Sequence, residues 1–70
     1  MENEKTYLGQ IEQGITKVMV YYIDSGYLIE FYTNDNLQAE CDLLDDDHVW
    51  RELKARGFKK SFRKVILSML

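Results

Sequence analysis

Cys41 and His48 are the two residues whose side chains are best suited to catalysis or to binding a transition metal. A cysteine thiolate becomes a nucleophile when a nearby histidine accepts its proton, and both groups are preferred zinc ligands. Zinc sites use several Cys and His residues at short, fixed spacings, whereas this chain has one of each. We therefore expect no metal site, no cofactor and no enzymatic activity. A small hydrolase that uses this pair is an alternative, which the reactivity of the thiol would test.

An acidic run extends over residues 42–47. It does not match a calcium-binding loop, because the glycine at the sharp turn and the closing glutamate are both missing. Acids favour the N-terminus of a helix, so the run predicts that a helix begins there. It also indicates a surface that could compete for the basic groove of a nucleic-acid-binding protein. This acidic surface consists of Glu40, Asp42, Asp45, Asp46 and Asp47.

The charge is distributed unevenly along the chain. Residues 1–50 hold eleven acids and two lysines, a balance of −9, whereas residues 51–70 hold seven bases and one glutamate, a balance of +6. Most of these bases lie opposite the apolar stripe of the last expected helix, where they favour a solvated outer face. Contact with nucleic-acid phosphates is the alternative function. We define the basic patch as Lys54, Arg56, Lys59, Lys60, Arg63 and Lys64.

The elements that must position these groups begin with a hairpin over residues 17–31, KVMVYYIDSGYLIEF. Val, Ile, Tyr and Phe dominate both halves, which predicts two strands. With Ser25-Gly26 as the turn, Ile23 pairs with Leu28, and each step outward along the two strands gives the next predicted pair. One side of this hairpin, the core face, then carries Val18, Val20, Tyr22, Ile29 and Phe31.

The opposite side of the hairpin, which we call the outer face, is also largely apolar although it includes Glu30. An antiparallel sheet that packs on one side normally carries polar residues on the other. Tyrosine, methionine and leucine are typical of interfaces, so we expect this face to bind a partner or a second copy. The alternative is that residues 1–12 fold over it. The predicted contact residues are Met19, Tyr21, Ile23, Leu28 and Tyr32.

A third strand follows the turn Asn34-Asp35-Asn36, because Asn and Asp tolerate left-handed backbone geometry. With these three residues as the loop, Thr33 pairs with Leu37 and Phe31 with Ala39. Leu37, Ala39, Cys41 and Leu43 then fall on the core face. Residues 6–12 could add a fourth strand, which Gly9 makes less favourable.

Two helices should complete the chain, over residues 46–56 and 59–69. At about 100° per residue, the apolar positions on either side of Gly57 would lie on different faces of one continuous helix. A break at Gly57 brings both apolar faces onto the sheet, and glycine is favoured at a helix C-terminus. The predicted fold is therefore α+β, a three- to four-stranded antiparallel meander followed by two short helices packed on one face.

The order of these elements resembles that of the KTSC domain, a small β-meander plus helix module. The resemblance covers most of residues 15–66 and rests on the sequence V-W-x-x-L-x-A-x-G-F with a later Phe62. Gln38 and Glu40 stand where that family usually has an aromatic pair. It therefore implies the architecture, and no residue role or function follows from it.

Seventy residues with a net charge of −3 indicate one small domain, with residues 1–5 disordered. The N-terminal residues do not resemble a signal peptide, and the longest apolar run is far shorter than the ~20 residues that span a bilayer. We expect a cytoplasmic protein that does not insert in membranes. The predicted function is that of a binding module or inhibitor of the phage or mobile-element type, such as an anti-CRISPR protein. It would occlude a surface of a larger protein, which could be a nucleic-acid-binding complex.

Overall fold

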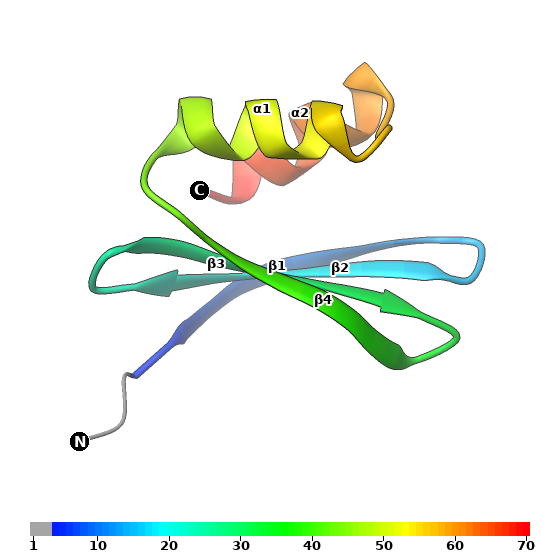
Figure 1. Cartoon of the computed structure of the whole chain (residues 1–70), viewed down its shortest axis with the longest axis horizontal. Coiled ribbons are helices and arrows are strands. Elements are labelled where there is room, and N and C mark those ends of the chain that lie inside the picture. The colour runs from blue at the N-terminus through cyan, green and yellow to red at the C-terminus, as the bar shows by residue number, and fades with distance from the viewer. Residues whose placement is uncertain (1–3) are drawn as a thin grey trace.

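The computed structural model describes residues 4–70 and confirms the predicted α+β class (Figure 1). Four antiparallel strands form one sheet in the order of the sequence, and two helices follow them. The strand at residues 6–12 is present, so the meander has four strands rather than three. The elements are β1 (Thr6–Gln13), β2 (Thr16–Ile23), β3 (Gly26–Thr33), β4 (Asn36–Leu43), α1 (Asp46–Ala55) and α2 (Lys60–Met69).

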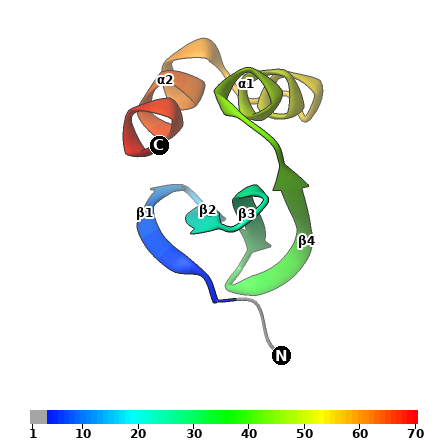
Figure 2. The ribbon, with the colours of Figure 1, turned by 90° about the vertical axis from the view of Figure 1, so that its left-hand side faces the viewer.

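Both helices lie on the same side of the sheet, which makes a two-layer structure (Figure 2). Apolar side chains from the core face and from the two helices meet between the layers and exclude water. Phe58, in the connection between the helices, stacks on both Phe31 and Phe62, with ring centroids 5.8 and 4.8 Å apart. The buried core cluster consists of Val18, Val20, Ile29, Phe31, Leu43, Val49, Leu53, Phe62 and Ile66.

The hairpin between β2 and β3 has the predicted faces but a different register. Ile23 pairs with Gly26 instead of Leu28, and the turn is Asp24-Ser25. The predicted turn begins one residue too late, so every predicted pair across this hairpin is displaced by two residues. Because side chains alternate with a period of two, this displacement leaves each residue on its predicted face.

The turn between β3 and β4 consists of Asn34 and Asp35, whose φ angles of 51° and 65° suit a type I′ turn. The predicted three-residue loop is one residue too long, because a β-bulge in β4 takes up the extra residue. Leu37 therefore pairs with Tyr32 rather than Thr33 and is 51% exposed, so its assignment to the core face is wrong. Beyond the bulge, the predicted register is confirmed for Phe31–Ala39, Ile29–Cys41 and Tyr27–Leu43.

Gly26 is required where β3 begins beneath the end of β4. Its φ angle of 140° is one that residues with a side chain rarely adopt. A Cβ atom here would collide with the carbonyl oxygen of Leu43 and approach that of Leu44 to 2.9 Å. The chain turns from the sheet into the helical layer at this point, so Gly26 allows the two layers to join closely.

The boundaries of the two helices lie within one residue of those predicted. Asp45 caps α1, accepting a 2.9 Å hydrogen bond from the backbone N–H of His48. Gly57, with a φ angle of 89°, separates the helices at the predicted break. The first helix is one residue shorter than predicted and the second begins one residue later.

Two predicted core positions besides Leu37 are exposed. Tyr22, on the core face near the end of β2, is 52% exposed and packs edge-to-face on Tyr27. Val65, which the helical phase assigns to the apolar stripe of α2 together with Phe62 and Ile66, is 45% exposed. Phe62 and Ile66, four residues apart, are buried as predicted, and Arg63 lies beside them.

The first described residues lie against the sheet. Lys5 forms an ion pair with Glu30 of β3, and a bulge between Tyr7 and Gly9 brings Leu8 against the core. Of residues 1–5, for which disorder is predicted, residues 1–3 lie outside the described residues, whereas Lys5 has a defined partner on the sheet. Neither helix of the described chain is long and apolar enough to cross a membrane.

Candidate binding surfaces

The outer face of the sheet carries no helix or strand of the described chain above it (Figure 2). Met19, Tyr21, Leu28 and Tyr32 are half-buried there, and Ile23 is buried at the end of β2. The sheet and neighbouring side chains thus shield these five residues from much of the solvent. The face is nevertheless formed largely by the apolar and aromatic groups that the sequence placed on it.

Contacts between strands hold the aromatic part of this face together. Tyr21 pairs directly with Leu28 across β2 and β3, and its hydroxyl lies 3.8 Å from the sulfur of Met19. Tyr7 of β1 packs edge-to-face on Tyr21, with ring centroids 5.8 Å apart. Lys5 therefore lies over part of the face, whereas Tyr7 extends the face from the neighbouring strand. Because β1 lies beside the face as a strand of the sheet and Leu8 contacts the core, the alternative in which residues 1–12 fold over the face is seen for Lys5 alone among the described residues.

Glu30 is the feature of this face that the sequence pattern does not reveal. It is 5% exposed, and its two carboxylate oxygens accept hydrogen bonds from Lys5 Nζ at 3.0 Å and from the Tyr32 hydroxyl at 2.9 Å. Burial works to raise the pKa of Glu30, but these hydrogen bonds and the nearby ammonium outweigh it and lower the pKa. An acid at an outward position of a strand normally indicates a solvated residue, so its burial could not be read from the sequence.

The tyrosines around Glu30 respond to its charge. The hydrogen bond to Glu30 is the main reason why the pKa of Tyr32 is raised. For Tyr21, burial is the largest cause of a raised pKa, followed by the repulsion between Glu30 and a phenolate. Both hydroxyls therefore stay protonated and available as hydrogen-bond donors near neutral pH.

The acidic surface is exposed, but its members have different structural tasks. Asp45 caps α1, and Asp47 forms an ion pair with Arg51 at 3.3 Å. Burial first, and then the charge and a hydrogen bond of Asp46, raise the pKa of Tyr27. The two remaining members, Glu40 and Asp42, lie on the edge strand β4.

Glu40 connects the acidic surface to the outer face. It pairs directly with Glu30 across β3 and β4. Directly opposed like charges destabilise a sheet, so this pair needs a cation nearby. Lys5 supplies one positive charge for two carboxylates, which leaves this part of the face negative.

The basic patch is smaller than predicted, because two of its members contact the protein itself. Arg63 is 9% exposed; its Nε donates to the Phe58 carbonyl at 3.1 Å, and its guanidinium lies 4.3 Å from the centre of the Trp50 ring. Arg56 stacks over Phe31 at 4.3 Å and donates to Glu52 at 2.8 Å. The placement of Arg63 opposite the apolar stripe is therefore wrong, since a tryptophan face gives its planar cation a buried position.

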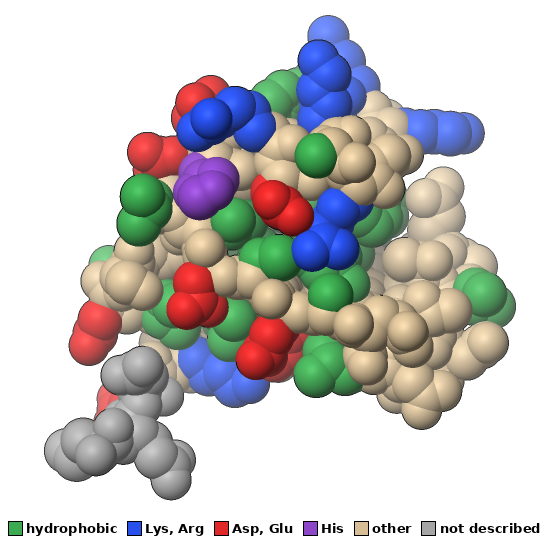
Figure 3. Space-filling model, in the orientation of Figure 1, with side chains coloured by type: hydrophobic (Ala, Val, Ile, Leu, Met, Phe, Trp, Pro, Cys, Tyr) green, Lys and Arg blue, Asp and Glu red, His purple; other side chains and the backbone are tan. Residues whose placement is uncertain are grey.

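Four lysines of the basic patch remain exposed along the helical layer. None of them forms an ion pair with an acid of residues 4–70. Figure 3 shows basic side chains mainly over the helices and acidic ones mainly over β4 and the start of α1. The charge asymmetry of the sequence is thus also a separation in space. These exposed residues are Lys54, Lys59, Lys60 and Lys64.

Cys41 and His48 have separate partners. The sulfur of Cys41 lies 3.0 Å from a guanidinium nitrogen of Arg56 and 3.8 Å from a carboxylate oxygen of Glu52. His48 Nδ1 accepts a hydrogen bond from the backbone N–H of Leu44 at 3.2 Å. The described residues contain no group of three His, Cys, Asp or Glu side chains arranged to hold a metal ion.

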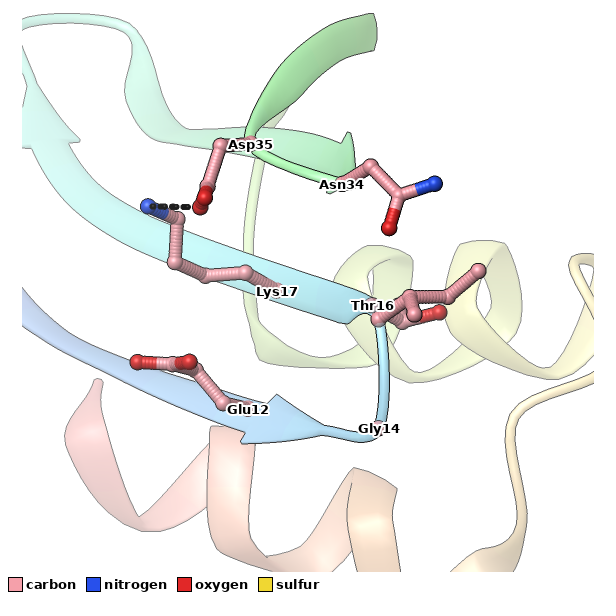
Figure 4. A pocket seen from close by; sticks show the side chains of 7 residues that line it. Glu12, Gly14, Thr16, Lys17, Asn34 and Asp35 are labelled. Atoms are coloured by element: carbon pink, nitrogen blue, oxygen red, sulfur yellow. Dashed lines mark ion pairs between the residues drawn. The ribbon is translucent and has the colours of Figure 1, made fainter.

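A pocket lies at the end of the sheet where two hairpin turns meet (Figure 4). The backbone N–H of Asn34 donates to the carbonyl of Ile15 at 2.9 Å and joins the turns. Lys17 and Asp35 form an ion pair at 3.6 Å across the pocket. Glu12 is the other charged residue of its lining, so the polar groups here mainly tie the two hairpins together.

Comparison with known proteins gives no family model that matches the chain, and no curated protein or solved structure matches it significantly. No match therefore links it to the KTSC domain, and the likeness noted in the sequence is one of architecture.

Proposed function

We propose that this protein is a small non-enzymatic binding module that acts by occluding a surface of a larger protein through the outer face of its sheet. The observation that carries the proposal is the composition of that face. Met19, Tyr21, Leu28 and Tyr32 form a half-buried cluster on the side of the sheet that bears no helix of residues 4–70. Aromatic and methionine side chains dominate the centres of protein interfaces.

The acidic surface would steer a basic partner toward this face. Glu40 and Asp42 lie on the edge strand β4, next to the outer face, and both are exposed. Complementary charge accelerates association and excludes wrongly charged partners. A protein with a basic groove, such as one that binds nucleic acid, fits this arrangement. Blocking of host machinery by phage or mobile-element proteins, anti-CRISPR proteins included, is the functional class that we propose.

A double variant tests this function. Tyr21→Ser with Leu28→Ser removes one cross-strand pair from the outer face, whereas Val65→Ser removes an exposed apolar side chain from α2 and serves as the matched control. Each protein is purified with whatever binds it from the cell in which it naturally occurs. We expect a stoichiometric partner, or a second copy, with the native protein and with Val65→Ser, but not with the double variant.

Circular dichroism tests whether the double variant remains folded. A native protein that purifies as a monomer with no partner would contradict the proposal. A double variant that unfolds would show that the outer face is core rather than interface. Sedimentation equilibrium of the purified protein separates a homodimer from a complex with another chain.

Direct nucleic-acid binding is the second candidate, favoured by the four exposed lysines without ion pairs in the described chain. We propose Lys60→Glu with Lys64→Glu as the test, because reversing the buried Arg63 would disturb the fold. Binding through these lysines should weaken steeply with salt, and the double reversal should reduce the salt slope by about 2. A protein that shifts neither DNA nor RNA at low salt excludes this function.

A further inference from the structure

A buried carboxylate occupies the middle of the surface that we propose for binding. Glu30 lies on the central strand β3, on the side of the sheet opposite the helices, yet it is 5% exposed. Burying a carboxylate is costly unless cations and hydrogen-bond donors surround it. Here the donors are the Tyr32 hydroxyl and the ammonium of Lys5, at 2.9 and 3.0 Å. The site therefore holds an ammonium group against a carboxylate.

One aromatic ring completes the surroundings of that ammonium. Lys5 Nζ lies 4.5 Å from the centroid of the Tyr21 ring, within the range of a cation–π contact. The ring of Tyr32 is covered by another lysine, since Lys17 Nζ lies 4.9 Å from its centroid, so Tyr32 contributes its hydroxyl to the site. A buried carboxylate with a tyrosine ring face and a phenol hydroxyl beside it is chemically suited to recognise a lysine side chain.

Lys5, which now occupies this site, is held there by its side chain alone. Lys5 precedes β1, so its backbone takes no part in the sheet, and its side chain is 46% exposed. Its removal would break the contacts to Glu30 and Tyr21 and would leave the strands paired. The loss would also leave Glu30 and the opposed Glu40 without a neutralising charge. The vacated site would therefore attract another cation.

We propose that Glu30, Tyr21 and Tyr32 form a lysine-binding site, which Lys5 fills in the free protein and a lysine of the partner fills in the complex. This inference rests on the proposed function, because it names the chemistry that the outer face recognises. The exchange replaces one ammonium with another, so the buried carboxylate stays paired throughout. Competition from Lys5 weakens binding, because the apparent dissociation constant rises in inverse proportion to the fraction of protein molecules whose site is free.

The test uses a small probe and needs no identified partner. Nα-acetyl-lysine methylamide is titrated into the native protein and into Lys5→Met, while NMR follows the ring signals of Tyr21 and Tyr32 and the carboxyl carbon of Glu30. Methionine keeps an apolar stem but removes the ammonium. We expect saturable shifts in Lys5→Met, with an apparent dissociation constant about fivefold or more below that of the native protein.

Two controls define the chemistry. Nα-acetyl-norleucine methylamide has the same length without the ammonium, and it should not produce these shifts. Adding Glu30→Gln to Lys5→Met should abolish the response to the lysine probe. Equal responses to the two probes, or an unchanged response in the double variant, would overturn the proposal.

A second measurement remains decisive if the Glu30→Gln protein does not fold. The pKa of Glu30 should rise in Lys5→Met and fall again when the lysine probe is added, because an ammonium favours the charged carboxylate. A Glu30 pKa that does not respond to the probe would overturn the lysine site. The binding module could still be correct in that case, since loss of the partner in Tyr21→Ser with Leu28→Ser is measured separately.

Discussion

The two faces of the sheet achieve burial in different ways. On the core face, Val18, Val20 and Ile29 are completely buried because two helices lie over them. On the outer face, Met19 and Tyr21 are shielded by neighbouring side chains and by Lys5, with no second layer in the described chain. The core face is therefore stabilised by excluding water, and the outer face mainly by specific pairs, which a partner could replace.

The largest effect should distinguish neighbouring residues on opposite faces of β3. Ile29→Ala removes a fully buried side chain and should lower the free energy of unfolding by about 3 kcal/mol, whereas Leu28→Ala, on the half-buried outer face, should cost about 1 kcal/mol. Urea denaturation measures both. Equal losses would mean that the outer face is as tightly covered as the core.

The second effect concerns the point where the sheet joins the helical layer. Gly26→Ala should destabilise the protein by about 2 kcal/mol or more, because the new Cβ meets the backbone of Leu43. Gly14→Ala is the matched control: its φ angle is also positive, at 64°, but its Cβ would have open space. We expect a cost of about 1 kcal/mol there. Thermal unfolding that ranks the two variants in reverse would contradict the close approach.

The third effect compares two bases in the helical layer. Arg63→Met removes the guanidinium from the Trp50 ring and should cost about 1.5 kcal/mol, while the exposed Lys64→Met should change stability by less than about 0.5 kcal/mol. The fluorescence of Trp50 should change in the first variant alone. Similar small effects in both variants would indicate that Arg63 belongs to the solvated face, as the sequence predicts.

The smallest effect concerns pH and the outer face. Because the folded protein lowers the pKa of Glu30 below its usual 4.5, its carboxylate stabilises the fold above that pH, and the contribution is lost as pH falls through the folded pKa. Glu30→Gln should therefore cost about 1 kcal/mol at pH 7 and nothing below the folded pKa.

The charged and titratable groups that face Glu30 are Lys5, Tyr21, Tyr32 and Glu40. Glu40 is the other carboxylate among them, so the comparison is made in a Glu40→Gln background by urea denaturation at several pH values. A cost that does not depend on pH would show that Glu30 contributes through packing rather than charge.

Much of the fold could be predicted because it depends on how apolar residues are spaced within short segments of the chain. Alternation with a period of two assigned Val20, Ile29 and Phe31 to the core face, and the helical phase located the break at Gly57. The same period tolerates a displacement of two residues, which is why the faces of the β2–β3 hairpin are right although its pairs are wrong. The geometry of the Asp24-Ser25 turn sets the register of the hairpin, and the alternation of apolar residues gives no information on that geometry.

The candidate site could be predicted only in its apolar part. Tyr21, Leu28 and Tyr32 reached the outer face by alternation, whereas the pair of Lys5 with Glu30 joins residues 25 positions apart. Nothing in the local pattern distinguishes this glutamate from a solvated one. Its burial depends on β1 pairing with β2 and so bringing Lys5 across the face.

The sequence by itself determined the faces of the strands, the ends of the helices and the separation of charge along the chain, because each depends on neighbours within a few residues. Only the tertiary structure decided which charged side chains are free. It placed Arg63 on Trp50 and Lys5 on Glu30, since such contacts require distant segments to pack together. The apolar character of the surface that we propose for binding therefore follows from the sequence, whereas the lysine site that we propose on it rests on contacts of the tertiary structure.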